Sequence, residues 1–164
     1  MQDFIKLRNN YTPSNIKVIF VLESPPEDHG YVYNPSGHTG EVLFRAFMKL
    51  IRIKPETKEE GLQKLKQEGI LLLNPTYTPV NKLSDKEANK IIMSNYDNFK
   101  KDLLKFNPEK KIPLILVKAN ICQLLEKPLI DDGFIVLNKG QMIPFPMHYH
   151  QERFHEIVSN LFKF

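Results

Sequence analysis

The sequence has a single cysteine, Cys122, and this scarcity excludes several classes of protein. One cysteine cannot form a disulfide within the chain, nor supply the thiolates of a structural zinc or iron–sulfur site. Long apolar runs are also missing, since none approaches the roughly 18–20 residues that a membrane span requires. Residues 1–10 lack the apolar core of a secretory signal. We therefore expect a cytoplasmic protein that binds no metal or other cofactor and makes no membrane contact.

Repeats, Gly/Ser linkers and the common nucleotide-binding motifs are absent too. The sequence contains no Walker loop, no dinucleotide-binding fingerprint and no Gly-x-Ser-x-Gly elbow. Its 164 residues, 41% hydrophobic and 26% charged, suit one domain with one sizeable core. We expect residues 1–164 to form a single, monomeric domain. The net charge of +4 permits a nucleic-acid partner without requiring one.

Short apolar runs alternate with stretches of helical periodicity along the chain. The apolar runs predict buried strands at residues 18–22, 70–73, 114–117 and 134–137. Helices are expected between and after them, at residues 41–52, 56–68, 84–106, 121–126 and 154–162. Ser84 and Glu87 have the spacing of a capping box at the start of the third helix. This order predicts an α/β fold, a three-layer α/β/α arrangement around a four-stranded parallel sheet.

Parallel sheets bind ligands beyond the carboxyl ends of their strands. Residues 23–40 follow the first predicted strand and are therefore the first candidate segment. Glu23 directly follows a predicted strand, where its carboxylate either faces a crevice or is satisfied by nearby amides. Gly37 and Gly40 precede a buried helix, with Thr39 as a candidate N-cap. Free amides in such a loop can hold a phosphate or carbonyl, although an ordinary glycine-rich helix entry has the same spacing.

Two further strand ends carry polar side chains. Asn74 follows the second predicted strand, where its amide can donate and accept at once and so suits a nucleobase edge. The alternative is an Asn that bonds to its own turn. His148 lies in the last loop and is a candidate donor to developing negative charge, or a loop histidine without a role. With His150 it lacks a third metal ligand, and His155 is expected to serve packing or the surface.

These segments, in this order, resemble the uracil-DNA glycosylase superfamily, with the family-4 type closest. Leu22-Glu23-Ser24-Pro25-Pro26 stands where that type has Gly-Glu-Ala-Pro-Gly, and residues 37–43 match its Gly-x-x-Gly-x-x-Leu helix entry. Leu73-Asn74 and His148 match the later strand-end motifs. The chain departs from the family in lacking the four cluster-binding cysteines. Pro35-Ser36 replaces the aromatic residue that stacks on uracil, and Tyr149-His150 follows the histidine.

The resemblance implies a base-excision mechanism on DNA that contains uracil or a related lesion. Glu23 would orient water and stabilise the sugar cation, while His148 would stabilise the departing base. Asn74 would read the uracil edge, and Tyr31 or Tyr33 would stack on the flipped base. Amides around Gly37 and Gly40 would hold phosphates, with Lys82, Lys118 or Arg153 on the rim.

Two other functions fit the same residues. The first is an inactive or divergent binding module of the same fold, which recognises nucleic acid or a nucleotide and releases no base. The second is an unrelated α/β hydrolase of a small nucleoside, which predicts a closed pocket and no DNA affinity.

Overall fold

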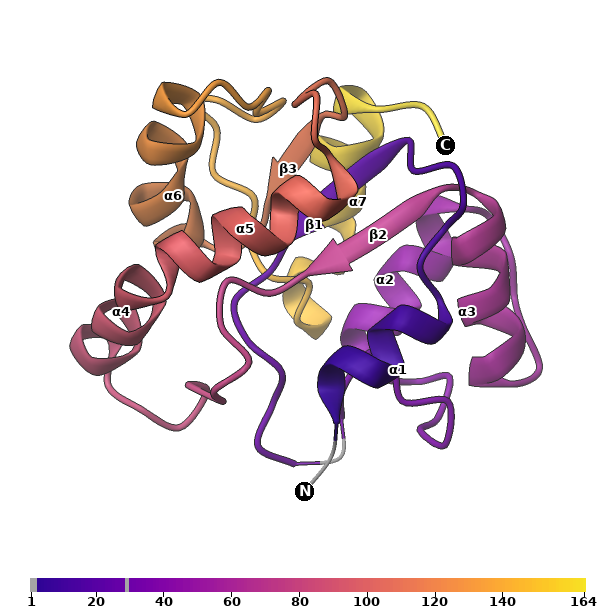
Figure 1. Cartoon of the computed structure of the whole chain (residues 1–164). Coiled ribbons are helices and arrows are strands. Elements are labelled where there is room, and N and C mark those ends of the chain that lie inside the picture. The colour runs from indigo at the N-terminus through magenta and orange to yellow at the C-terminus, as the bar shows by residue number, and fades with distance from the viewer. Residues whose placement is uncertain (1–2, 29) are drawn as a thin grey trace.

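A computed structural model describes residues 3–28 and 30–164 and shows an α/β fold (Figure 1). The strands are β1 (Val18–Val21), β2 (Ile70–Leu73) and β3 (Leu114–Leu116). Seven α-helices and one short 3₁₀ helix are present in this part of the chain. They are α1 (Phe4–Asn10), α2 (Val42–Leu50), α3 (Lys58–Gln67), α4 (Asp85–Ser94), α5 (Tyr96–Phe106), α6 (Ala119–Asp131), η1 (His148–His150) and α7 (Gln151–Leu161). None of the helices described is both long and apolar enough to cross a bilayer.

The sheet is parallel, with strand order β2-β1-β3. Phe20 at its centre pairs with Leu72 on one side and Ile115 on the other. A fourth full strand at residues 134–137 is not formed, and only an isolated parallel bridge joins Val136 to Leu114. Ile135 in this run is 46% exposed, so the segment lies at the sheet margin instead of inside it.

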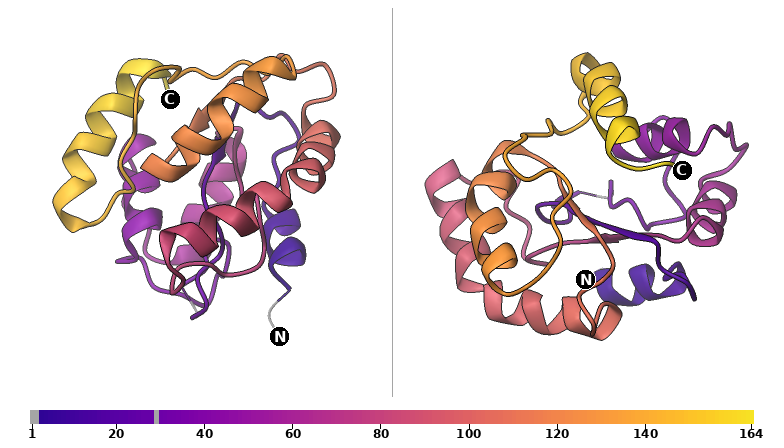
Figure 2. Two further views of the ribbon diagram at one scale, coloured as in Figure 1. Left: turned by 90° about the vertical axis from the view of Figure 1, so that its left-hand side faces the viewer. Right: turned by 90° about the horizontal axis from the view of Figure 1, so that it is seen from above.

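Side chains alternate between two cores because successive residues of a strand point to opposite faces. Val18 and Phe20 contribute to the core beneath α2, α3 and α7, while Ile19 and Val21 contribute to the core beneath α4, α5 and α6. Figure 2 shows the corresponding helices on opposite sides of the sheet. Burial on both faces explains why the strands read as continuous apolar runs.

The predicted helices are present, but some of their bounds and caps differ from the prediction. The capping box at Ser84 and Glu87 is present. The expected single helix over 84–106 is divided at Asn95, whose side-chain Nδ2 donates to the Ile91 carbonyl oxygen at 2.9 Å. An Asn side chain that bonds to the preceding turn competes with the helix backbone. Thr39 is not an N-cap, because α2 begins after Glu41, whose side chain makes no cap bond.

Two elements were not fully predicted from the sequence pattern. The helix expected at 121–126 extends over Ala119–Asp131 and contains Pro128. Helix α1 was missed, and the buried Arg8 guanidinium attaches it to α5 through Asp102 Oδ2 at 2.7 Å. Tyr77 also accepts a hydrogen bond from Arg8, at 2.8 Å, so a residue just beyond β2 joins this contact.

Candidate functional site

A cleft of about 570 Å³ lies where the carboxyl ends of β1 and β2 meet the start of α2 and the loop before η1. It is the position that the strand-end rule predicts. Its lining includes Leu22, Tyr31, Glu41, Asn74, Phe145 and His148. The structure therefore brings Asn74 and His148, predicted separately from the sequence, to one cavity.

Asn74 lines this cleft and also a neighbouring hollow beside α5. The residue is 4% exposed and follows Leu73, the last residue of β2. Within the described residues its side-chain amide has no protein hydrogen-bond partner, whereas the nearby Asn81 Oδ1 accepts the Glu27 N–H at 3.1 Å. The donor and acceptor of this amide are therefore available to a ligand or to water.

His148 stands on the exposed side of the cleft, and Arg45 fixes its tautomer. Arg45 Nη2 lies 2.8 Å from His148 Nδ1. A guanidinium has donors only, so Nδ1 must accept and the proton of the neutral ring is on Nε2. His148 therefore offers an N–H donor at Nε2. Arg45 was not predicted as a site residue, although it belongs to the polar stripe of the predicted helix over 41–52.

Glu23 lies in a separate polar cluster beside the cleft and is not among its lining residues. Its two carboxylate oxygens each lie 2.8 Å from Lys118 Nζ, and Oε2 also accepts from Asn120 Nδ2 at 2.6 Å. Asn120 Nδ2 donates to Asn89 Oδ1 as well, at 3.1 Å. The Glu23 side chain is 12% exposed, and its neighbour Leu22 reaches the cleft.

The backbone of Lys118 is strained. Its φ of 87° lies in the left-handed region that residues with a Cβ avoid. Its backbone N–H donates to the Ile143 carbonyl at 2.8 Å, which holds the turn after β3 in place. Such outliers are retained where surrounding contacts compensate for them, often at functional sites. Residues 118–120 directly follow the strand predicted at 114–117, but the Glu23 contact depends on the β1–β3 pairing.

The expected aromatic platform is only partly formed. Tyr31 borders the cleft but is 1% exposed, packed edge-on against Phe4 and Tyr33. Burial raises the pKa of the Tyr31 hydroxyl, which has no partner within the described residues. Tyr33 does not line the cleft, because its hydroxyl accepts the Leu72 N–H at 2.8 Å. This contact satisfies a donor on the outer edge of the sheet, so Tyr33 serves the fold and not base stacking.

The glycine loop does not form the expected cradle of free amides. The Gly37 N–H donates to the Asn34 carbonyl and the Gly40 N–H donates to His38 Nδ1, both at 3.2 Å. A Cβ on Gly37 would lie 2.1 Å from Glu41 Oε1, so this glycine is needed for close packing. Of the two, only Gly40 borders the cleft. Their amides are already paired, which argues against the phosphate-binding role.

A buried ion pair supports the cleft wall behind this loop. Lys58 Nζ lies 2.5 Å from Glu41 Oε2 and 2.9 Å from the Tyr31 carbonyl oxygen. Its side chain is fully buried, and this desolvation lowers the pKa of Lys58 despite the neighbouring carboxylate. Both of its partners line the cleft, so the pair holds the loop against α2 and α3.

The remaining predicted cations and histidines are dispersed. Lys82 pairs with Glu27 on the surface at 3.1 Å, and Lys118 is committed to Glu23. Arg153 is exposed on α7. The His150 ring packs at a tilt of 58° against Tyr149, with 4.4 Å between the ring centres. In the described part of the chain, no group of three or more His, Cys, Asp or Glu side chains is arranged to hold a metal.

Comparisons of the chain with protein-family models, with curated proteins and with solved structures give no match.

Proposed function

We propose that the protein is a uracil-DNA glycosylase-like hydrolase that cleaves the N-glycosidic bond of uracil or a related damaged base in DNA. The observation that carries the proposal is the shared cleft of Asn74 and His148 at the carboxyl ends of the strands. The proposal includes the three-layer α/β/α architecture of that superfamily, with residues 134–137 as a reduced fourth strand.

The cleft has the volume and the polar groups that a nucleobase requires. Its volume of about 570 Å³ falls within the range of small-molecule sites. Asn74 would donate to and accept from the base edge, and a base with the wrong donor pattern would leave the amide unpaired. The Nε2–H of His148 would donate to the oxygen that gains negative charge as the base leaves.

Glu23 would act on the sugar side of the bond. Departure of the base leaves positive charge on the sugar, which a carboxylate stabilises while it orients the attacking water. Lys118 and Asn120 fix this carboxylate in one orientation, and they occupy three of its roughly four acceptor positions. One acceptor position then remains for the water.

Release of uracil from a labelled oligonucleotide, followed by alkali cleavage, tests the proposal. With single- and double-stranded substrate, we expect Glu23→Gln and His148→Gln each to lower the single-turnover rate by about 10²–10³-fold. Asn74→Ala should lose discrimination between uracil and cytosine. The matched control is Glu27→Gln, on the same loop but 58% exposed and paired with Lys82 on the surface.

Two results would overturn different parts of the proposal. If neither form of the substrate releases uracil, the protein does not have this activity. If uracil is released but Glu23→Gln and Asn74→Ala are as active as the parent, the reaction uses other residues.

A second candidate function is binding without hydrolysis, and the state of Glu23 favours it. Its carboxylate is engaged by Lys118 and lies outside the cleft lining. A binding module would retain salt-dependent affinity for uracil-containing DNA, weakened by Asn74→Ala, with no base release from any variant.

A further inference from the structure

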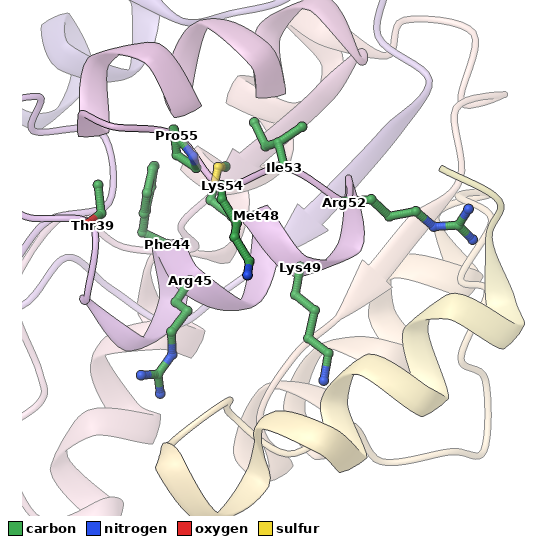
Figure 3. A pocket seen from close by; sticks show the side chains of 9 residues that line it. All are labelled: Thr39, Phe44, Arg45, Met48, Lys49, Arg52, Ile53, Lys54 and Pro55. Atoms are coloured by element: carbon green, nitrogen blue, oxygen red, sulfur yellow. The ribbon is translucent and has the colours of Figure 1, made fainter.

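A second hollow, the α2 groove, lies between the outer side of α2 and the segment that follows it (Figure 3). Its volume is about 510 Å³. Four apolar residues contribute to its floor, namely Phe44, Met48, Ile53 and Pro55. Four cationic residues line it as well, namely Arg45, Lys49, Arg52 and Lys54. No carboxylate is among its lining residues.

The four cations have no carboxylate partner within the described residues. Arg45 and Lys49 are one helical turn apart and extend from the same side of α2, as Figure 3 shows. Like charges at this spacing repel weakly, and an anion bound beside them would relieve that repulsion. The positive charge of these residues also acts on His155 in α7. Burial lowers the pKa of His155, and the charges of Lys49 and Arg52 lower it further.

Arg52 lines this surface from the turn that ends α2, where its N–H donates to the Lys49 carbonyl at 3.2 Å. It lies just beyond α2 with φ of 60°, in the left-handed region. Helices often place glycine at such a position, because a side chain there is strained. An arginine at this position adds backbone strain to the repulsion among the cations.

The apolar floor of the α2 groove indicates which uncharged group an anionic ligand would carry. Phe44 is fully buried, so no aromatic face is available for a base to stack on. Ile53 and Pro55 are half-buried and Met48 is 4% exposed, so the accessible part of the floor is aliphatic and suits an aliphatic side chain. A cationic rim around an aliphatic floor therefore matches a carboxylate-rich segment with a leucine-like anchor, more closely than it matches a nucleic-acid strand.

We propose that the α2 groove docks a short acidic segment of a partner protein, with an aliphatic side chain on Met48 and Ile53 and carboxylates on the cationic rim. The groove adjoins the Asn74 cleft through Arg45, which lines the groove and contacts His148, but the docking proposal does not rest on the proposed hydrolysis. Its occupant would recruit the protein or position it.

The test uses the full chain and fluorescein-labelled peptides of about twelve residues. One peptide has acidic residues around two leucines, a second has serines in place of the leucines, and a third has lysines in place of the acids. We expect the acidic leucine peptide to bind with a Kd of about 10–100 μM in fluorescence anisotropy. The other two should bind at least about tenfold more weakly.

Two sets of variants locate the binding. Lys49→Glu combined with Lys54→Glu should weaken it by at least about tenfold, whereas Lys101→Glu with Lys139→Glu, on exposed lysines outside the groove, should not. Arg52→Gly should weaken binding while raising Tm by about 2–4 °C through relief of the left-handed strain. Weaker binding in a more stable protein cannot result from misfolding.

Three results would overturn the proposal. The acidic leucine peptide fails to bind below about 1 mM, or the serine peptide binds equally well. Alternatively, an oligothymidylate of the same length displaces the peptide with the same dependence on Lys49 and Lys54, which makes the groove a nucleic-acid surface.

Discussion

Replacement of Lys58 by methionine tests whether one buried ion pair holds the wall of the Asn74 cleft. The substitution keeps the length and apolar stem of the side chain but removes the ammonium that Glu41 and the Tyr31 carbonyl share. Breaking a buried ion pair by removing one partner costs about 3–5 kcal/mol, because the other charge remains desolvated.

The geometry places this substitution near the lower limit of that range. The Glu41 carboxylate keeps 15% exposure and still accepts the His38 N–H at 3.2 Å. We therefore expect Lys58→Met to lower the free energy of unfolding by about 3 kcal/mol, and Tm by about 6–12 °C.

Urea denaturation of four proteins measures this effect: the parent, Lys58→Met, Glu41→Gln and the double variant. A neutral amide at position 41 needs no counter-charge, so the double variant should recover about 1–2 kcal/mol relative to Lys58→Met. The matched control is Lys127→Met, which breaks an exposed pair with Asp131 at 2.6 Å and should cost less than about 0.5 kcal/mol.

The reasoning is refuted if Lys58→Met is no more destabilising than the Lys127→Met control. It also fails if the double variant is less stable than Lys58→Met, since the unpaired carboxylate would then not be the source of the cost.

Three further predictions concern the sheet edge, the glycine loop and α7. Tyr33→Phe removes the acceptor of a backbone N–H on β2, so unfolding in urea should show a loss of about 1–2 kcal/mol; unchanged stability would contradict the edge-capping role. Gly37→Ala should destabilise by about 1–3 kcal/mol because its Cβ meets Glu41 Oε1 at 2.1 Å, and Gly40→Ala, with a nearest contact of 3.2 Å, should cost less. Burial holds the pKa of His155 below 6.5, so the unfolded chain binds the proton first and stability falls from about pH 7 to pH 5. His155→Gln should flatten that fall in the urea midpoint, and an equally steep profile in both proteins would refute the assignment.

The parallel α/β architecture follows from local sequence signals. Val18 to Val21 and Ile70 to Leu73 are apolar at every position because helices cover both faces, and such runs are visible without any tertiary information. The segment 134–137 has the same composition but makes a single bridge to β3. Its failure to form a strand is decided by the packing of neighbouring segments, which an apolar run does not encode.

The residues of the candidate site were likewise only partly predictable from the sequence. Asn74 and His148 could be chosen in advance, because each follows a predicted strand and the carboxyl ends of parallel strands meet at one edge. Tyr33 could not be told from Tyr31, since only the folded chain turns one hydroxyl toward the edge of β2. Arg45 and Lys118 acquire their roles through contacts with residues more than ninety positions away in the chain.

An amino-acid pattern was enough to predict the fold class, the position of three strands, the capping box of α4 and the edge at which polar side chains gather. Those features depend on periodicity and on nearby residues. The tertiary structure alone decided that Lys118 and Asn120 hold Glu23 beside the cleft, that the glycine-loop amides are already paired, and that four cations line an apolar groove on α2. These arrangements arise from side chains brought together by strand pairing and helix packing, and the scarcity of cysteine leaves that packing, with no disulfide, to hold them in place.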